Sequence, residues 1–208
     1  MFADIDACDV PVDVVIDFSN AAAVDGMLDA CVRKKLPVVL CTTGLSEEQL
    51  AHVQKCSEEI AILRSANMSL GVNLLMKLLK QATGVLAPAG YDIEIVEKHH
   101  NQKLDAPSGT AIALADSINE ELGQAYAYNY NRSDVRQKRE KNEIGIVAVR
   151  GGTIVGEHEV LFAGEDEVIE FKHTAYSKAI FAKGAVSAAA FLAGKEPGMY
   201  DMADVINF

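Results

Sequence analysis

The sequence is short of positive charge. Its 19 lysines and arginines are outnumbered by 30 aspartates and glutamates, which gives a formal net charge of −11 at pH 7. This balance argues against nucleic acid or an anionic membrane as the main partner. The longest apolar runs are too short to span a bilayer, and the acidic N-terminus lacks the apolar core of a signal peptide. A protein of this charge that binds an anion must gather its positive groups locally.

Cysteine is scarce and shows no pairing pattern. The four cysteines lie in the first third of the chain, at positions 8, 31, 41 and 56, without a C-x-x-C motif. This pattern predicts free thiols in a reducing cytosol and disfavours a disulfide or zinc framework. We therefore expect a cytoplasmic protein without a metal site.

The first third of the chain alternates strand and helix patterns. Short β-branched apolar runs at 12–18, 37–43 and 60–66 are typical of buried strands. Apolar residues recur at helical spacing between the first two runs, and Ser46 with Gln49 forms a capping box that predicts a helix start between the last two. Such repetition favours a parallel sheet covered by helices.

The pattern changes after about residue 68. The predicted elements are a helix at 69–87, a strand at 91–99, a helix at 108–122 and a loop at 124–142. Three strand-like runs follow, separated by Gly151-Gly152 and by residues 164–166, which we interpret as hairpin turns. An alanine-rich helix at 178–194 ends at Gly194.

These patterns predict two domains that join near residues 65–75. We expect a strand–helix domain at 1–68, a second domain with a hairpin sheet at 69–194, and a C-terminal segment at 195–208 that returns toward the first domain.

The stretch "EKHHNQKLDAPSGTA", residues 97–111, gathers several anion-binding groups. Pro107-Ser108-Gly109-Thr110 is typical of a helix start, where the first backbone N–H groups have no partner within the helix. Ser108 can cap this helix, and Gly109 lets a ligand approach the backbone closely. Such an end binds carboxylate or phosphate.

His99, His100 and Lys103 lie just before this helix start, at the end of a predicted strand, where sites of α/β proteins usually open. An imidazole and an ammonium facing an anion could transfer protons near neutral pH. Adjacent histidines point to opposite sides of an extended chain, so at most one need face a site. A metal site here is not favoured, because the histidines lack the i, i+4 spacing of helical ligands and have no third ligand nearby. Taken separately, each feature also fits an ordinary surface or core position.

The order of these residues closely resembles the E-x-H-H-x-x-K-x-D-A-P-S-G-T-A signature of the 4-hydroxy-tetrahydrodipicolinate reductase family, nicotinamide-dependent enzymes of bacterial diaminopimelate and lysine biosynthesis. Further segments are similar to that family in the same order: "VVIDFS" (14–19), "TTG" (42–44), "ANMSLGVN" (66–73), "GTIVGEHEVLF" (152–162) and "FAKGAV" (181–186). The resemblance covers essentially all 208 residues.

The resemblance implies an α/β fold, with a partial Rossmann-like parallel sheet and an α+β substrate and oligomerisation domain that has a mixed sheet. It also implies a small cyclic dicarboxylate as substrate, reduced by hydride from NADH or NADPH, and a homotetramer. No nucleic acid and no membrane are expected as partners.

The resemblance also implies roles for single residues. His99 would be the general acid/base and Lys103 the proton donor. Substrate carboxylate would be held by His100, Ser108, Gly109 and Thr110. The nicotinamide end of the cofactor would be contacted by Cys41, Thr42, Thr43, Ser65, Ala66, Asn67 and Met68. Lys178 stands where such enzymes often carry arginine.

The sequence departs from the family pattern at its start, because it contains no G-x-x-G-x-M-G loop to hold the cofactor pyrophosphate. Cofactor binding is therefore expected to be impaired in this chain, with weak activity or none. The alternative is a non-catalytic dicarboxylate-binding or assembly module derived from the enzyme. A third hypothesis, nucleic-acid binding through the aromatic and basic segment 126–141, is disfavoured by the acidic net charge.

Overall fold

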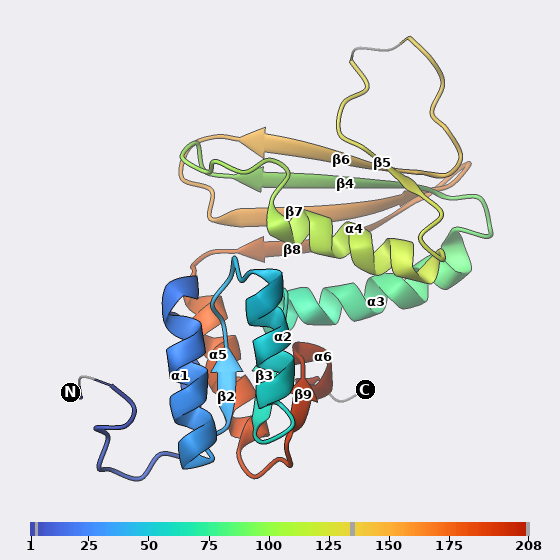
Figure 1. Cartoon of the computed structure of the whole chain (residues 1–208). Coiled ribbons are helices and arrows are strands. Elements are labelled where there is room, and N and C mark those ends of the chain that lie inside the picture. Colours follow the sequence, from blue (N-terminus) through green and yellow to red (C-terminus); the bar gives the residue numbers. More distant parts are fainter. Residues whose placement is uncertain (3, 134–135, 207–208) are drawn as a thin grey trace. The chain divides into compact units, whose positions relative to one another are not determined.

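The computed structural model describes residues 1–2, 4–133 and 136–206, and the chain divides into two compact units (Figure 1). The first unit comprises Met1–Leu70 and Ala179–Phe208, and the second comprises Gly71–Lys178. Asp134 and Val135, within the expected loop, lie outside the described residues, as do residues 3, 207 and 208.

Within the described part of the chain, no helix combines the length and apolar character needed to cross a bilayer.

The first unit is built on a parallel sheet of four strands in the order β1-β2-β3-β9. The strands are β1 (Val15–Asp17), β2 (Val38–Leu40), β3 (Ala61–Arg64) and β9 (Gly198–Tyr200). The two central strands, β2 and β3, are apolar and buried on both faces except at Arg64, as parallel strands in α/β proteins require. This arrangement confirms the parallel sheet predicted from the strand–helix pattern.

Helices cover both faces of this sheet. On one face, α1 (Ala21–Lys34) and α2 (Glu47–Cys56) pack against Val38 and Leu40, whereas α5 (Ala179–Leu192) and α6 (Met202–Val205) pack on the face that carries Val39. Side chains alternate between the two faces because a strand has a period of two residues. The capping box predicted at Ser46 and Gln49 begins α2.

Helix α5 belongs to the first unit, whereas the expected division grouped its residues with 69–194. Gly184 explains how the helix lies so close to the chain after β3. A Cβ atom at this position would lie 1.6 Å from the carbonyl oxygen of Met68. Only glycine allows this approach of two backbones.

The second unit contains a mixed sheet of five strands in the order β5-β6-β4-β7-β8. The strands are β4 (Asp92–His99), β5 (Ala127–Asn129), β6 (Glu143–Arg150), β7 (Gly156–Ala163) and β8 (Val168–Ala175). Strands β5, β6 and β4 run parallel, and β7 and β8 are antiparallel to their neighbours.

The hairpin predicted at Gly151-Gly152 is wrong, because β4 lies between β6 and β7 and pairs with both. The turn at 164–166 does join paired strands, β7 and β8. Residues 127–129 form the edge strand β5, although the sequence of 124–142 predicted only a loop. Local turn chemistry cannot reveal that an earlier strand lies between two consecutive ones.

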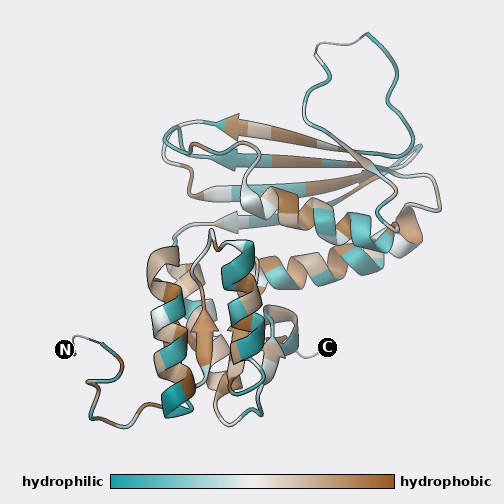
Figure 2. Cartoon of the chain, viewed as in Figure 1, coloured by the Kyte–Doolittle hydropathy of each residue, from teal (hydrophilic) through white to brown (hydrophobic). Residues whose placement is uncertain are grey.

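Two helices cover one face of this mixed sheet: α3 (Leu70–Leu86) and α4 (Gly109–Glu121). Apolar and polar positions alternate along the strands (Figure 2). The covered side of β4 carries Ile93 and Ile95, and then Glu97 and His99. The core face therefore becomes polar toward the end of β4.

The neighbouring strand β7 places His158 in this polar end of the core, where it is 4% exposed. Its Nε2 lies 3.0 Å from Ser108 Oγ, and its Nδ1 has no hydrogen-bond partner among the described residues. Burial, followed by the nearby His99, lowers the pKa of His158 to about 4. The ring is therefore neutral in the folded chain at neutral pH.

The contact of Gly184 with Met68 predicts that Gly184→Ala destabilises the chain by about 2–3 kcal/mol, because a backbone segment must move to admit the methyl group. The matched control is Gly26→Ala in α1, where no heavy atom lies within 4 Å of the added Cβ. This variant should gain up to about 1 kcal/mol from helix propensity. Denaturant unfolding of both variants measures the difference, and equal effects would contradict the close approach.

The buried His158 predicts a loss of stability in acid. Because its folded pKa of about 4 lies below the unfolded value near 6.5, the unfolded chain binds more protons between these values. Neutral His158 contributes on the order of 3 kcal/mol to the free energy of unfolding above pH 6.5, and this contribution is lost as the pH falls to about 4. The unfolding free energy of His158→Gln should fall less over this range than that of the wild type. An NMR titration of His158 with a midpoint near 6.5 would contradict the account.

Candidate active site

Strand pairing brings distant residues to the end of β4. His99 is the register partner of Arg150 on β6, and Glu97 is the partner of His158 on β7. The first residue before α4, Ser108, donates its backbone N–H to Glu97 Oε1 at 2.9 Å. Groups from β4, from β6 and from the start of α4 therefore meet at the Glu97 carboxylate, with β7 paired alongside β4.

Glu97 is fully buried, and both of its carboxylate oxygens accept hydrogen bonds. Arg150 donates from Nη2 to Oε1 at 2.7 Å and from Nη1 to Oε2 at 2.8 Å. Burial alone would raise the pKa of Glu97, but hydrogen bonds from Arg150, His99 and the N–H of Ser108 together hold it below its usual value. The ion pair also raises the pKa of Arg150. Glu97 is therefore an ionised carboxylate within the core.

His99 is oriented by this carboxylate. Its Nδ1 lies 2.6 Å from Glu97 Oε2, and its ring meets the edge of the His158 ring with 5.1 Å between centroids. A Cβ atom on Gly156 would lie 3.1 Å from His99 Nε2, so the glycine leaves space beside this nitrogen. If Nδ1–H donates to Glu97, Nε2 is the atom that can exchange a proton with a ligand.

Lys103 lies in the loop between β4 and α4 and forms an ion pair with Asp105, with 2.8 Å between Nζ and Oδ1. The hydrogen bond from Lys103 lowers the pKa of Asp105, and the backbone N–H of Gly109 at the start of α4 contributes in the same direction. The Lys103 ammonium therefore holds one carboxylate in this loop, shortly before the start of α4.

The predicted cap of α4 is confirmed: Ser108 Oγ accepts a hydrogen bond from the N–H of Ala111 at 3.2 Å. The same hydroxyl contacts His158, so the helix start is fixed to β7 as well as to β4. His100 follows the last residue of β4 and is half-buried, and Thr110 lies in the first turn of α4. The predicted residues thus lie at the end of β4, in the loop that follows it and at the start of α4.

Three residues of this cluster were not predicted: Glu97, Arg150 and His158. Glu97 carried a signal, because it shares one strand face with His99 and a charged residue on a core face requires a partner. Arg150 and His158 come from other strands, and only the strand register places them beside Glu97.

The predicted cofactor residues lie in the first unit, after the carboxyl ends of β2 and β3. Leu40 and Arg64 are register partners, so residues 41–43 and 65–68 follow neighbouring strand ends. Dinucleotide sites of open α/β sheets form at such ends. The structure therefore brings the two predicted segments to one edge of the parallel sheet.

Asp17, at the end of β1, holds this edge together and was also not predicted. Its Oδ2 accepts a hydrogen bond from Thr42 Oγ1 at 2.6 Å, and its backbone carbonyl accepts one from the N–H of Cys41 at 2.9 Å. Burial, with Asp17 nearby, raises the pKa of the Cys41 thiol to about 12. Cys41 is therefore a neutral thiol, suited to packing rather than to nucleophilic chemistry.

The second cofactor segment is also held by local contacts. The side-chain oxygen of Asn67 accepts a hydrogen bond from the N–H of Ser69 at 2.8 Å, just before α3. Met68 is 5% exposed and packs in the core beneath α5, where Gly184 approaches its carbonyl. Ser65 is half-buried and Ala66 is exposed, which leaves this part of the turn open to a ligand.

The basic segment 126–141 is partly neutralised by the chain itself. Arg139 Nη1 lies 2.9 Å from Asp92 Oδ1, and its Nε lies 3.0 Å from Glu94 Oε1. Arg132 pairs with Glu94 and Glu143. These arginines fasten the segment to β4 and β6, which explains them without a phosphate ligand.

The chain matches known proteins along most of its length. Sequence models of dihydrodipicolinate reductase match residues 1–68 with the N-terminus and residues 71–206 with the C-terminus. The 4-hydroxy-tetrahydrodipicolinate reductases of Caldanaerobacter subterraneus subsp. tengcongensis and of Clostridium novyi are each 52% identical over 207 residues, covering 100% of this chain and 82% and 81% of those relatives.

A solved structure agrees with these sequences. It is the dipicolinate-bound dihydrodipicolinate reductase from Paenisporosarcina sp. TG-14, which is 25% identical with a TM-score of 0.76, over 93% of this chain and 74% of that chain. The sequence matches span both units, and the resemblance found in the sequence is confirmed. The chain belongs to the dihydrodipicolinate reductase family of NAD(P)H-dependent oxidoreductases.

Proposed function

We propose that this chain reduces 4-hydroxy-tetrahydrodipicolinate, the step named for its relatives, and that His99 and Lys103 carry the proton transfers. The observation that supports this most is the buried Glu97–His99 pair, followed in the chain by the Lys103–Asp105 ion pair just before a helix start. The ionised Glu97 fixes the imidazole, and Lys103 already binds a carboxylate. A small dicarboxylate matches these groups in charge.

In this proposal the start of α4 holds one substrate carboxylate through the backbone of Gly109 and Thr110 and the hydroxyl of Ser108. His100 contributes a further donor to that carboxylate. The substrate then takes the place of Asp105 as the partner of Lys103, because both offer a carboxylate to the same groups. Displacing a residue of the same loop needs only a side-chain rotation.

The substrate first loses its 4-hydroxyl group as water, which leaves a conjugated C=C–C=N system. The nicotinamide cofactor, when bound, would supply the hydride to this system. The Lys103 ammonium would stabilise the negative charge that builds up and donate a proton. His99 exchanges a proton through Nε2, with Glu97 stabilising the imidazolium that forms. Glu97 is a positioning residue in this scheme, because it acts through His99.

We propose that residues 41–43 and 65–68 hold the nicotinamide end of NADH or NADPH. The Asp17–Thr42 bond and the Asn67–Ser69 bond give these segments defined positions at the edge of the sheet.

The non-catalytic module is not favoured, because the relatives are named reductases. Assembly into a homotetramer remains a prediction, supported by exposed apolar residues on the uncovered face of the mixed sheet, among them Val147, Val149 and Val168. A cytoplasmic location also remains a prediction.

The roles of His99 and Lys103 predict that His99→Ala and Lys103→Ala each lower kcat by about 10²–10⁴-fold. The assay follows nicotinamide oxidation, with substrate generated in situ by the preceding enzyme of the pathway. Lys80→Ala is the control, because Lys80 pairs with Glu120 on the helices of the same unit. Calorimetry with dipicolinate measures the substrate half separately. Dipicolinate binding without any turnover of the wild-type chain would favour the non-catalytic module.

The positioning role of Glu97 predicts a different kinetic change. Glu97→Gln should lower kcat by about 10²-fold and change KM little, because the imidazole loses its charged partner while the helix start remains. Glu94→Gln is the matched control, since Glu94 lies on the opposite face of the same strand. Unchanged kcat in Glu97→Gln would show that His99 acts without this partner.

A further inference from the structure

Helices α1 and α2 face each other with two pairs of metal-ligating residues, each pair at i, i+4 spacing: Asp25 with Asp29, and His52 with Cys56. We propose that His52, Asp29 and Cys56 bind a divalent transition-metal ion of the zinc type, and that Asp25 orients His52 from behind. This cluster lies in the first unit and is separate from the residues assigned to cofactor and substrate.

Both ring nitrogens of His52 face a carboxylate. Nδ1 lies 2.9 Å from Asp25 Oδ1, and Nε2 lies 3.1 Å from Asp29 Oδ1. A neutral imidazole carries one N–H, so it can donate to only one of the two. At the other ring nitrogen, the lone pair and the anionic carboxylate oxygen repel each other. A metal cation bound between these two atoms removes that repulsion.

Asp25 is suited to be the partner behind the ring. Its second oxygen, Oδ2, accepts a hydrogen bond from Gln49 Nε2 at 3.1 Å, so the carboxylate is held from two sides. If Nδ1–H donates to Asp25, the tautomer is fixed and Nε2 is directed toward Asp29. A carboxylate that orients a ligating histidine in this way is a regular feature of zinc sites.

Cys56 supplies the third ligand. It is 6% exposed, and no hydrogen bond to its sulfur occurs within the described residues. The ligand atoms of Asp29, His52 and Cys56 all lie within 4.8 Å of one another. A tetrahedral ion with bonds of about 2.0–2.3 Å needs ligand atoms about 3.2–3.7 Å apart. Small side-chain rotations, above all of the exposed Asp29, bring the three ligand atoms to this shorter spacing.

The surrounding space fits an ion with one further ligand. Asp29, His52 and Cys56 line a surface pocket of ≈ 260 Å³, together with the aliphatic and charged residues Val32, Arg33, Lys55 and Glu59. A water molecule can therefore complete the tetrahedron. The nitrogen, sulfur and oxygen donors suit Zn²⁺ better than Mg²⁺ or Ca²⁺, which take oxygen ligands. Binding displaces the thiol proton to solvent and leaves a thiolate on the metal.

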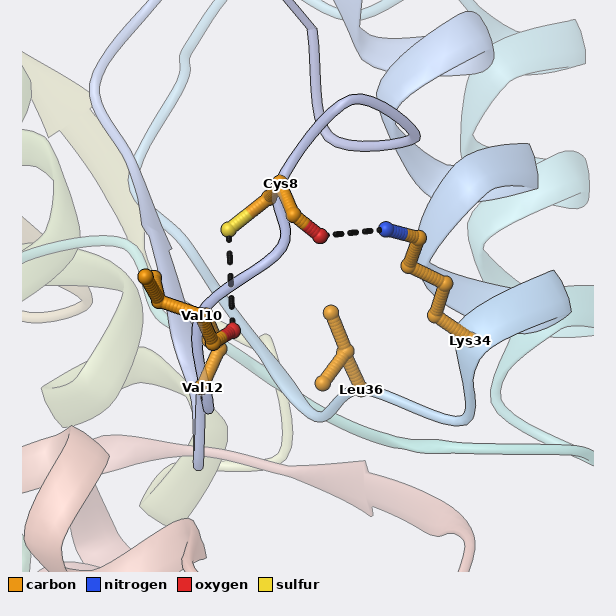
Figure 3. Close-up of a pocket in the computed structure, with 5 residues that line it drawn as sticks. All are labelled: Cys8, Val10, Val12, Lys34 and Leu36. Atoms are coloured by element: carbon orange, nitrogen blue, oxygen red, sulfur yellow. Dashed lines mark hydrogen bonds between the residues drawn. The ribbon is translucent and has the colours of Figure 1, made fainter. Parts of the chain in front are cut away.

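A second surface pocket provides a matched comparison (Figure 3). It is lined by Cys8, Val10, Val12, Lys34 and Leu36. The Cys8 sulfur contacts the carbonyl of Val10 at 3.8 Å, and Lys34 Nζ donates to the carbonyl of Cys8 at 3.0 Å. This pocket offers a thiol and an ammonium but has no histidine or carboxylate in its lining. We therefore expect no metal ion to bind at Cys8.

The test is a titration of the reduced 208-residue chain with Co²⁺, whose tetrahedral thiolate complexes absorb through charge-transfer and d–d bands. We expect these bands to saturate at one Co²⁺ per chain and to be removed by Zn²⁺. Cys56→Ser should abolish the charge-transfer band, and Cys8→Ser should keep it. Asp25→Asn should keep the band and weaken binding about 10–100-fold.

Asp29→Asn is a second variant that removes a ligand without changing a buried residue, because the Asp29 side chain is 57% exposed. It therefore separates the loss of a metal ligand from misfolding of Cys56→Ser. Asp29→Asn should also bind Co²⁺ more weakly. In addition, Zn²⁺ should raise the melting temperature of the wild type but not that of Cys56→Ser. A wild-type chain without a charge-transfer band, or a band that persists in Cys56→Ser, would overturn the proposal and leave His52 as a helix–helix ion pair.

Discussion

The second unit depends on one buried charge, the carboxylate of Glu97. A carboxylate on the core face of a strand is strongly unfavourable unless it is paired and hydrogen-bonded. Here Arg150, His99 and the N–H of Ser108 satisfy it, and each comes from a different segment of the chain. The same contacts that make the charge tolerable therefore join β6, the end of β4 and the start of α4. Removing one partner of such a buried pair costs about 3–5 kcal/mol, which ties the stability of this end of the sheet to the geometry of the site.

Chemistry follows from the same arrangement. Because Glu97 holds Nδ1 of His99, the opposite nitrogen lies beside Gly156, whose lack of a side chain leaves space next to it. The start of α4 is fixed in the same step, because the N–H of Ser108 donates to the same carboxylate, and Lys103 lies in the loop between His99 and this helix start. An acidic chain thus gathers its positive groups around one helix start, as a dicarboxylate ligand requires.

Much of this could be predicted from the sequence, because local patterns determine the elements. The sequence predicts every strand except β5 and β9, together with the capping box at Ser46 and the cap at Ser108, and the family resemblance implies roles within the stretch 97–111. What could not be predicted depends on pairing between distant segments. Gly151-Gly152 looked like a hairpin turn because nothing local shows that β4 lies between β6 and β7.

The unpredicted site residues have the same origin. Arg150 reaches Glu97 only through the register of β6 with β4, and Asp17 reaches Thr42 only through the pairing of neighbouring parallel strands. The cluster of His52 and Cys56 with Asp29 likewise depends on the contact of two helices, and the cysteine pattern gave no indication of it. Side chains that meet across elements are the part of a site that spacing alone does not show.

The central claim is that ionised Glu97 selects one tautomer of His99, and the most direct test is ¹⁵N NMR of the histidine side chains near pH 8. The account predicts that neutral His99 carries its proton on Nδ1 and has an unprotonated Nε2, and that Glu97→Gln weakens this preference. A neutral His99 protonated on Nε2 in the wild-type chain would contradict it, because the imidazole could then not donate to Glu97.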